Sequence, residues 1–251
     1  MQRLRDLMTP GSKIRYILWR ALRLPVNIKI QLISGEVLNL RPRPSDDIET
    51  AFEIFVAQVY KSPISVETGS FKQIVDLGAN VGFSGIYFAN KYPQARIIAF
   101  EPHPQHVQKA TYNLALNGSL QRFDLVCGAA SSRTQEAFLT NEGVCSTVIS
   151  ERLSGAIPIR LVDVFEYLKE ISIDILKIDI EGGEFSLLED YRFDKLQARI
   201  IVLEYHILPD RPDACNWCRQ KLAEFGYQTE LGAWNGSNNG FIWAYRDVAT
   251  I

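Results

Sequence analysis

The hydrophobic and polar positions of the first 65 residues form short amphipathic patterns. In "NIKIQLISGEVLNLRP" (27–42), apolar and polar residues alternate on both sides of Ser34-Gly35, which predicts a β-hairpin. Apolar residues at helical spacing then predict a helix from about Asp46 to Tyr60. We therefore expect residues 1–65 to form an N-terminal cap of helices and a β-hairpin.

The segment before the hairpin, "RLRDLMTPGSKIRYILWRALRLP" (3–25), is basic and amphipathic. The break at Thr9-Pro10-Gly11 keeps the predicted helix short. We expect the helix to turn a basic face to solvent and to pack its apolar side chains on the domain, namely Ile14, Ile17, Leu18 and Leu22. A helix lying on a membrane surface is the alternative, which we favour less.

From residue 66 the chain changes to short, almost continuously apolar runs that alternate with helical patterns. The runs are "QIVDLG", "ARIIAFEP", "FDLVCGAAS", "IDILKIDIEG" and "ARIIVLEYH", followed by a closing hairpin of "YQTELG" and "GFIWAY". Such strands are typical of a sheet that helices cover on both faces. We assign residues 66–251 to one α/β domain with a doubly wound, mainly parallel sheet, to which "EAFLT" and "IPIRLVD" add accessory strands.

The composition excludes several classes of protein. The 251 residues are 47% hydrophobic and carry a formal charge of -2, which gives no general attraction for nucleic acid. No apolar run approaches the roughly 20 residues that span a bilayer. Since the N-terminus lacks the features of a secretory signal, we expect a cytoplasmic protein. The close cysteine pair in "CNWC" (215–218) follows no strand directly, so we expect it to be structural.

Ionisable side chains stand where the predicted strands end. In a doubly wound sheet, ligands bind beyond the carboxyl ends of the strands. Ala129 ends the third strand, and the other strand-end residues are Asp76, Glu101, Asp179, Glu181, Glu204 and His206. Such residues at nearly every strand end indicate a binding site.

The turn in "VDLGANVGFSG" (75–85) indicates which cofactor binds. In the dinucleotide motif G-x-G-x-x-G, the second glycine lets the backbone approach a pyrophosphate, but here Asn80 takes that place. An acid directly before the turn, Asp76, would repel phosphates and attract a cation. S-adenosylmethionine carries an ammonium and a sulfonium and no phosphate. Glu101, about 20 residues past the glycines, is placed to accept the ribose hydroxyls of either cofactor.

The motifs "VDLGANVG", "FEPHP", "GAASS", "LKIDIEGGE" and "LEYH" occur in this order between about Phe71 and His206. In them the chain resembles the FkbM-type methyltransferases, and "KIDIEGGE" is the most specific piece. The resemblance implies a seven-stranded Rossmann-like methyltransferase fold, S-adenosylmethionine as cofactor and O-methylation of sugar or natural-product hydroxyls. The segments 1–65 and 141–155 match no motif of the family, and we expect them to select the acceptor.

Two groups of site residues follow from these arguments. We expect the cofactor to be held by Asp76, Gly78, Ala79, Asn80, Gly82, Glu101 and Pro102, with Ala129 near the adenine. In the sheet order of the family, the strands that end at Asp179 and Glu204 follow the strand that ends at Asp76. The catalytic cluster facing the methyl group is then Asp179, Glu181, Glu204 and His206.

Three roles are open for this cluster. In the first, His206 or a carboxylate takes the proton of the acceptor, because crowded carboxylates raise one another's pKa. In the second, the four residues bind a divalent cation such as Mg²⁺. In the third, Lys177 and Arg160 pair with the acids and the cluster is structural. Gly182-Gly183 favours the first two, since two glycines let a ligand come close and offer free amides.

We therefore expect an O-methyltransferase that acts on a hydroxyl of a sugar or a small glycosylated metabolite. The expected partner is a small-molecule or glycan acceptor and not nucleic acid, and the sequence carries no indication of the oligomeric state. Two alternatives stay open: an NAD-dependent sugar oxidoreductase, and a non-catalytic module that binds cofactor or acts as a scaffold.

Overall fold

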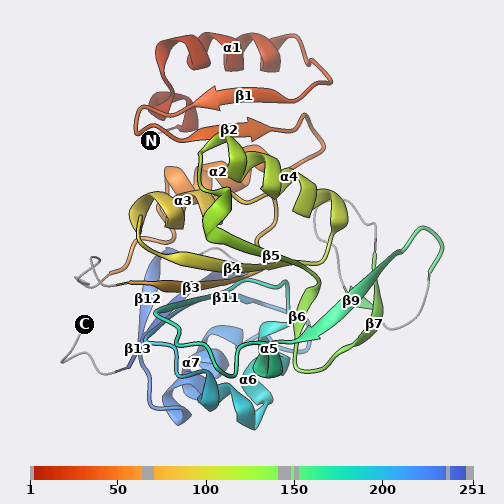
Figure 1. Ribbon diagram of the computed structural model, residues 1–251, viewed down its shortest axis with the longest axis vertical. Helices are drawn as coiled ribbons and strands as arrows, with labels where there is room; N and C mark the ends of the chain where they lie inside the picture. Colours follow the sequence, from red (N-terminus) through yellow and green to blue (C-terminus); the bar gives the residue numbers. More distant parts are fainter. Residues whose placement is uncertain (1–2, 64–70, 141–147, 150–152, 236–237, 247–251) are drawn as a thin grey trace.

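The computed structural model describes residues 3–63, 71–140, 148–149, 153–235 and 238–246 (Figure 1). The expected boundary between residues 65 and 66 and most of the segment 141–155 lie outside the described residues. No described helix combines the length and hydrophobicity that crossing a membrane requires.

A seven-stranded sheet forms the centre of the molecule and confirms the predicted fold class. Its strands lie in the order β12-β13-β11-β10-β3-β4-β5. They span Gln228–Asn235 (β12), Asn239–Tyr245 (β13), Ile200–His206 (β11), Ile175–Ile178 (β10), Gln73–Leu77 (β3), Arg96–Glu101 (β4) and Phe123–Cys127 (β5). The five strands from β11 to β5 are parallel, and the hairpin of β12 and β13 adds antiparallel to β11. The carboxyl ends of β3, β4, β10 and β11 therefore meet at one edge.

Helices cover both faces of this sheet, as its continuously apolar strands predict. Helices α3 (Phe83–Lys91) and α4 (Pro104–Leu116) lie on one face, and α5 (Val164–Tyr167), α6 (Glu184–Glu189) and α7 (Ala214–Glu224) on the other (Figure 1). Successive strand residues face opposite ways. Ile74 packs in the core under α3, and Val75 packs in the core under α6 and α7.

The N-terminal cap is stacked on the face that α3 and α4 cover. It consists of the 3₁₀ turn η1 (Leu4–Leu7), α1 (Pro10–Ala21), the hairpin of β1 (Ile28–Gln31) and β2 (Val37–Leu40), and α2 (Asp47–Phe55). Asn113 of α4 and Asn117, directly after α4, satisfy backbone amides of β2: Asn113 accepts from Asn39 N at 3.0 Å and Asn117 from Val37 N at 2.9 Å. The buried side chains of the cap continue into those under α3 as one cluster. The helix predicted from about Asp46 to Tyr60 is α2, which already ends at Phe55 and is therefore shorter than expected.

Helix α1 presents the opposite face from the one we expected. Ile14, Ile17, Leu18 and Leu22 are 63%, 46%, 53% and 64% exposed, so the prediction that they pack on the domain is wrong. Tyr16 and Trp19 are buried in their place. These aromatic side chains bury more apolar area, and Trp19 Nε1 also donates to the carbonyl oxygen of Val26 at 2.7 Å.

A smaller four-stranded sheet lies beside the central one, in the order β6-β9-β7-β8. Its strands are Ala129–Ser131 (β6), Gln135–Leu139 (β7), Val148–Ile149 (β8) and Ile157–Asp163 (β9). The single strand expected over "FDLVCGAAS" is therefore two strands in two sheets. Gly128 lies between them, where an added Cβ would come within 2.7 Å of the Val162 side chain. The accessory strands predicted from "EAFLT" and "IPIRLVD" are confirmed as the antiparallel pair of β7 and β9.

Candidate functional site

The glycine turn after β3 is shaped by close packing. Gly78 has a φ of +89°, and a Cβ added there would lie 1.8 Å from the carbonyl oxygen of Asp179. Gly82 has a φ of +85° and lies against the backbone of Ala110 in α4. Between them, Asn80 adopts a φ of +48° without being glycine. The ends of β3 and β10 thus approach as closely as glycine at position 78 permits.

Asp76, which we expected to attract the cofactor, is enclosed in the protein and lines neither of the two cavities described below. Its carboxylate is fully buried, accepts a hydrogen bond from Ser84 Oγ at 2.6 Å and lies 2.9 Å from Lys177 Nζ. Burial alone would lower the pKa of Lys177, but Asp76, Tyr60 and Asp179 raise it well above its ordinary value. The negative charge of Asp76 is therefore balanced inside the protein.

Lys177 also stabilises the glycine turn that follows β3. It donates to the carbonyl oxygen of Gly78 at 2.5 Å and lies 3.4 Å from Asp179 Oδ2. Of the acids of the predicted cluster, Lys177 thus pairs with Asp179, and its shorter ion pair is with Asp76, outside that cluster. Arg160, the other cation named for that role, lies on β9 of the smaller sheet.

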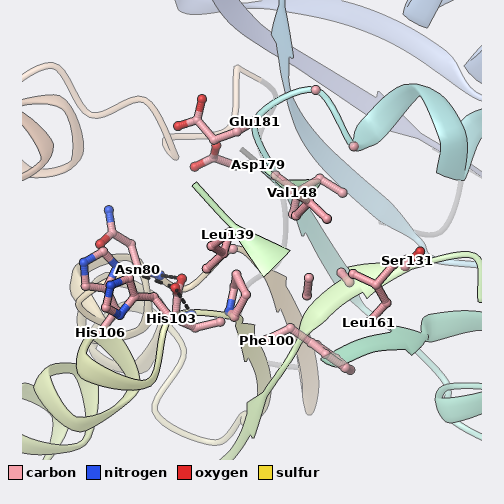
Figure 2. Close-up of a pocket in the computed structure, with 18 of the residues that line it drawn as sticks. Asn80, Phe100, His103, His106, Ser131, Leu139, Val148, Leu161, Asp179 and Glu181 are labelled. Atoms are coloured by element: carbon pink, nitrogen blue, oxygen red, sulfur yellow. Dashed lines mark hydrogen bonds and ion pairs between the residues drawn. The ribbon is translucent and has the colours of Figure 1, made fainter. Parts of the chain in front are cut away.

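A cavity of about 470 Å³ opens beyond the ends of β3 and β4 (Figure 2). Its apolar lining comes from β4, from the residue that follows β4 and from the smaller sheet; these residues include Phe100, Pro102, Ala129, Ala130, Leu139, Val148 and Leu161. In Figure 2 the side chains of Asp179 and Glu181 lie together at one end, apart from the pair formed by His103 and His106. These two imidazoles stack with their centroids 4.5 Å apart and both line the cavity.

Glu101 lines this cavity and also joins two of its walls. Its Oε2 accepts a hydrogen bond from Asn80 N, and its Oε1 accepts one from His103 N, both at 2.9 Å. A carboxylate has about four acceptor positions. Glu101 can therefore hold the turn and still accept hydrogen bonds from two vicinal hydroxyls.

A second cavity, of about 430 Å³, lies on the other side of the turn and is strongly acidic. Its walls come from α2, the end of β10 and the end of β11. The carboxylates that line it are Asp46, Glu53, Asp179, Glu181 and Glu204, and the cationic side chains are Lys177 and His206. This lining disfavours phosphates and favours cations. The two cavities share Gly78, Asn80, Asp179 and Glu181 as lining residues.

The remaining predicted cofactor residues are divided between the cavities and the interior. Pro102 and Ala129 line the first cavity, and Ala79 lines the second. Gly82 contributes to the turn by packing against Ala110. Asp76 contributes through its ion pair with Lys177 and its hydrogen bond from Ser84. The cap supplies Asp46, Thr50, Glu53 and Tyr60 to the second cavity, and no motif of the sequence pointed to them.

Glu184 orients His206, and the sequence analysis missed it. The Glu184 carboxylate is fully buried in the first turn of α6 and accepts from His206 Nδ1 at 3.0 Å and from His206 N at 3.1 Å. The other ring nitrogen, Nε2, lies 3.5 Å from Glu181 Oε2 and 3.9 Å from Glu204 Oε1. Glu184 is the last residue of "KIDIEGGE", so its position in that motif was the available signal.

The amides of the two glycines in this motif are not free, contrary to our expectation. Gly182 N donates to Glu184 Oε2 at 2.8 Å, and Gly183 N donates to the carbonyl oxygen of Ile180 at 3.1 Å. Their hydrogen bonds shape the turn that precedes α6. Glu181, directly before them, has a φ of +52°, which is unfavourable for a residue with a Cβ.

The crowded carboxylates of the second cavity raise the pKa values of several ionisable groups there. Burial and the neighbouring Asp179 raise the pKa of Glu204 to about 9, and the same two causes raise the pKa of Glu53 to about 7. Burial would lower the pKa of His206, but the Glu184 hydrogen bond and the surrounding acids raise it to about 9. At neutral pH these pKa values correspond to a neutral Glu204 and a protonated His206.

Three of the four predicted cluster residues also fit a metal ion. Asp179, Glu181 and His206 each offer a ligand atom, and these atoms lie within 4.8 Å of one another. Glu204 is not in this group, and its side chain accepts from Asn239 Nδ2 at 2.5 Å. The contact of Glu184 with His206 Nδ1 is the arrangement that fixes metal-binding histidines in many proteins.

Sequence comparison gives the relatives of the chain. The family model described as "Methyltransferase FkbM domain" matches residues 76–229. Methyltransferase sdnD of Sordaria araneosa is 34% identical, over 46% of this chain and 59% of its own length. O-methyltransferase imqG of Aspergillus flavus is 29% identical, over 30% of this chain and 31% of its own length. The match thus spans less than two thirds of either relative.

A solved methyltransferase structure has a fold similar to that of this chain. The crystal structure of methyltransferase FkbM from Methylobacillus flagellatus superposes with a TM-score of 0.55 at 15% identity, over 75% of this chain and 47% of that one. At this identity the likeness concerns the fold alone. The fold and the family match together confirm the resemblance that the sequence motifs indicated.

Proposed function

The chain belongs to the FkbM methyltransferase family, and from this we propose that it transfers the methyl group of S-adenosylmethionine to a hydroxyl of a sugar or a small glycosylated metabolite. The observation that carries the proposal is the junction of two cavities of opposite character. One is apolar, with a carboxylate beside it, and the other is acidic. A ligand with a neutral nucleoside at one end and positive charges at the other fits this pair.

The first cavity suits the adenosine part of the cofactor. Phe100, Ala129 and Leu161 offer apolar surface to an adenine ring, and Glu101 offers acceptor positions to the ribose hydroxyls. The ammonium and sulfonium groups would lie toward Asp179 and Glu181, where the cavities meet. Because Asp76 is paired with Lys177, we now give the cationic end to Asp179 and Glu181 in its place.

The same charges argue against the oxidoreductase alternative. The pyrophosphate of NAD would lie beside the turn at Gly78, next to the carboxylates of Asp179 and Glu181. Burying two phosphates among carboxylates is unfavourable. The name of imqG contains O-methyltransferase, which agrees with a hydroxyl acceptor.

His206 is the residue we propose to take the proton of the acceptor. Without cofactor the ring is protonated, with a pKa of about 9, and the positive charges of a cofactor bound beside it would lower that pKa. Because Nδ1–H is held by Glu184, the proton is lost from Nε2, and the neutral ring then presents its lone pair to the second cavity. The acceptor oxygen forms a bond to the methyl carbon, the carbon–sulfur bond breaks with its electron pair going to sulfur, and the hydroxyl proton goes to Nε2. One positive charge thus moves from sulfur to His206, and the surrounding carboxylates stabilise it at both places.

A metal ion is the alternative route to a deprotonated acceptor. A divalent cation on Asp179, Glu181 and His206 would lower the pKa of a bound hydroxyl. A nitrogen ligand beside two carboxylates suits Mn²⁺ or Fe²⁺ better than Mg²⁺. The routes differ in one measurement: the metal route requires that EDTA stop turnover and that Mn²⁺ restore it, whereas the base route predicts the same rate in EDTA.

Calorimetry with the full chain tests the proposed cofactor. We expect S-adenosylmethionine to bind with micromolar affinity and NAD to give no heat. Glu101→Gln should weaken S-adenosylmethionine binding, while Gln121→Glu, an exposed change, should leave it unaltered. Binding of NAD in place of S-adenosylmethionine would remove the assignment.

Turnover separates an enzyme from the non-catalytic alternative. Formation of S-adenosylhomocysteine is measured with a panel of glycosides and their sugar-free counterparts. We expect turnover with the glycosides and a methyl ether in the product. Cofactor binding without turnover on any hydroxyl compound would favour a scaffold module.

A further inference from the structure

Exposed apolar side chains are concentrated on one small part of the cap. Half of the large hydrophobic side chains that are exposed in the described residues belong to the segment 14–33. They are Ile14, Ile17, Leu18, Leu22, Leu24, Val26 and Ile33. A contiguous apolar patch on a soluble domain marks an interaction site.

Helix α1 carries an apolar stripe on each of two faces. Ser12, Tyr16 and Trp19 point to the hairpin, where Ser12 Oγ accepts from Gln31 N at 2.8 Å. Ile14, Leu18 and Leu22 follow at intervals of four residues on another face and are exposed. The docking of the cap buries one stripe, and the other stays exposed among the residues that the structure describes.

The charged residues of the segment that carries the exposed stripe are all positive. From residue 7 to residue 35 there is no aspartate or glutamate, although the whole chain has a formal charge of -2. The basic residues of this segment are Lys13, Arg15, Arg20, Arg23 and Lys29, and all five are exposed. At helical spacing, Arg15 lies on one side of the stripe and Lys13 on the other. Basic residues that flank an apolar stripe are typical of helices that lie in a lipid interface.

The position of α1 lets a flat surface reach it. Figure 1 shows α1 at the end of the longest axis of the molecule, lying across that axis and separated from the central sheet by the hairpin. A plane that touches this end meets α1 before the other labelled elements. We propose that α1 docks the protein on an anionic lipid surface, with Ile14, Leu18 and Leu22 in the interface.

A cavity beside the stripe fits the same partner. It lies between η1, α1 and α2 and measures about 700 Å³. Its lining combines three arginines, Arg3, Arg5 and Arg20, with one acid, Glu49, and with apolar residues such as Ile17 and Phe52, so that its net charge is positive. Guanidinium groups bind phosphate by paired hydrogen bonds, so this lining suits the headgroup of an anionic phospholipid.

Vesicle sedimentation with the full chain tests the proposal. We expect the protein to pellet with vesicles that contain about 30% phosphatidylserine, to bind phosphatidylcholine vesicles at least tenfold more weakly, and to be released by salt. The double variant I14D/L18D should lose at least tenfold in vesicle affinity, because two charges enter the apolar stripe. The matched control is Tyr191→Asp, since Tyr191 is 76% exposed on another part of the molecule.

Each outcome of the vesicle experiment either supports or overturns the proposal that α1 docks on lipid. Loss of vesicle binding in I14D/L18D, with cofactor binding kept and Tyr191→Asp like the wild type, supports the proposal. Failure of the wild type to pellet with anionic vesicles overturns it, as does equal binding by wild type and I14D/L18D. Sedimentation velocity without lipid identifies one competing occupant. If the wild type is a dimer that I14D/L18D dissociates, and vesicles do not bind, the stripe is an interface between two copies of the chain.

Discussion

The carboxylate of Glu184 accepts a hydrogen bond from Nδ1 of His206 at 3.0 Å and so directs Nε2 into the acidic cavity. Glu184 is fully buried, whereas His206 reaches the cavity lining. A fixed tautomer is what either a proton acceptor or a metal ligand requires at this position. Glu184 is therefore a positioning residue in both mechanisms.

Glu184→Gln should lower the pKa of His206 from about 9 toward its ordinary value, because the imidazolium loses its buried counter-charge. Proton NMR can follow this shift, since the chain has three histidines. We expect turnover to fall by about one to two orders of magnitude while cofactor affinity stays. The control is Glu189→Gln on the exposed face of the same helix, and an unchanged His206 pKa in Glu184→Gln would contradict the assignment.

Lys177→Met should destabilise the fold by about 3 to 5 kcal/mol, because it leaves the carboxylate of Asp76 buried without its partner. Urea denaturation followed by circular dichroism measures the loss. The double variant Asp76→Asn/Lys177→Met removes both charges and should recover a large part of it. If the single variant is as stable as the wild type, Asp76 has another partner.

Gly78→Ala should abolish folding or cofactor binding, because the added methyl group meets the carbonyl oxygen of Asp179 at 1.8 Å. Gly118→Ala is the matched control, since Gly118 has a φ of +63° and open space around it. We expect this control to cost about 1 kcal/mol, from backbone strain alone. Melting temperatures and calorimetry compare the two variants. Equal losses of stability and cofactor affinity would show that backbone strain at a positive φ is responsible and that the contact with the Asp179 carbonyl oxygen is not.

The unliganded protein should become less stable as the pH rises from about 6.5 to 9. The folded state holds a proton on His206 up to a pKa of about 9, whereas the unfolded chain releases it near 6.5, so this stability is lost over that interval. Glu204 acts in the same direction, because its folded pKa of about 9 lies above the ordinary 4.5. Scanning calorimetry in EDTA measures the slope.

Glu204→Gln tests the contribution of Glu204 to this pH dependence. The variant has no proton to lose at position 204, so its melting temperature should fall less between pH 6.5 and 9. At pH 8 it should melt above the wild type. A wild-type melting temperature that rises over this interval would mean that the acids of the cavity are ionised in the folded state.

The sequence was sufficient for the central sheet because each of its strands is a continuous apolar run with turn residues on both sides. It also placed Glu101, Asp179, Glu181, Glu204 and His206 near one another, since parallel strands end at one edge. It could not reveal the partner of Asp76, which lies 101 positions further along the chain at Lys177. Local pattern carries no information about which distant cation neutralises a buried acid.

Helix α1 shows a second limit. Its periodicity identifies apolar positions, but the segment offers two stripes, and the choice between them depends on what the hairpin can accommodate. Trp19 and Tyr16 fill that space, and Trp19 also finds an acceptor in Val26. The contribution of α2 to the acidic cavity was hidden for a similar reason. Glu53 looks like an ordinary exposed position of an amphipathic helix until the sheet edge lies beside it.

The bridge that Glu101 makes between Asn80 N and His103 N has a consequence for the energetics of ligand capture. The loop after β3 and the first turn of α4 are already tied together before any nucleoside arrives. A ligand therefore meets walls that need no ordering, and little conformational entropy is lost when it enters. Association should then be fast, and differences in affinity among nucleoside analogues should reside in how quickly they leave.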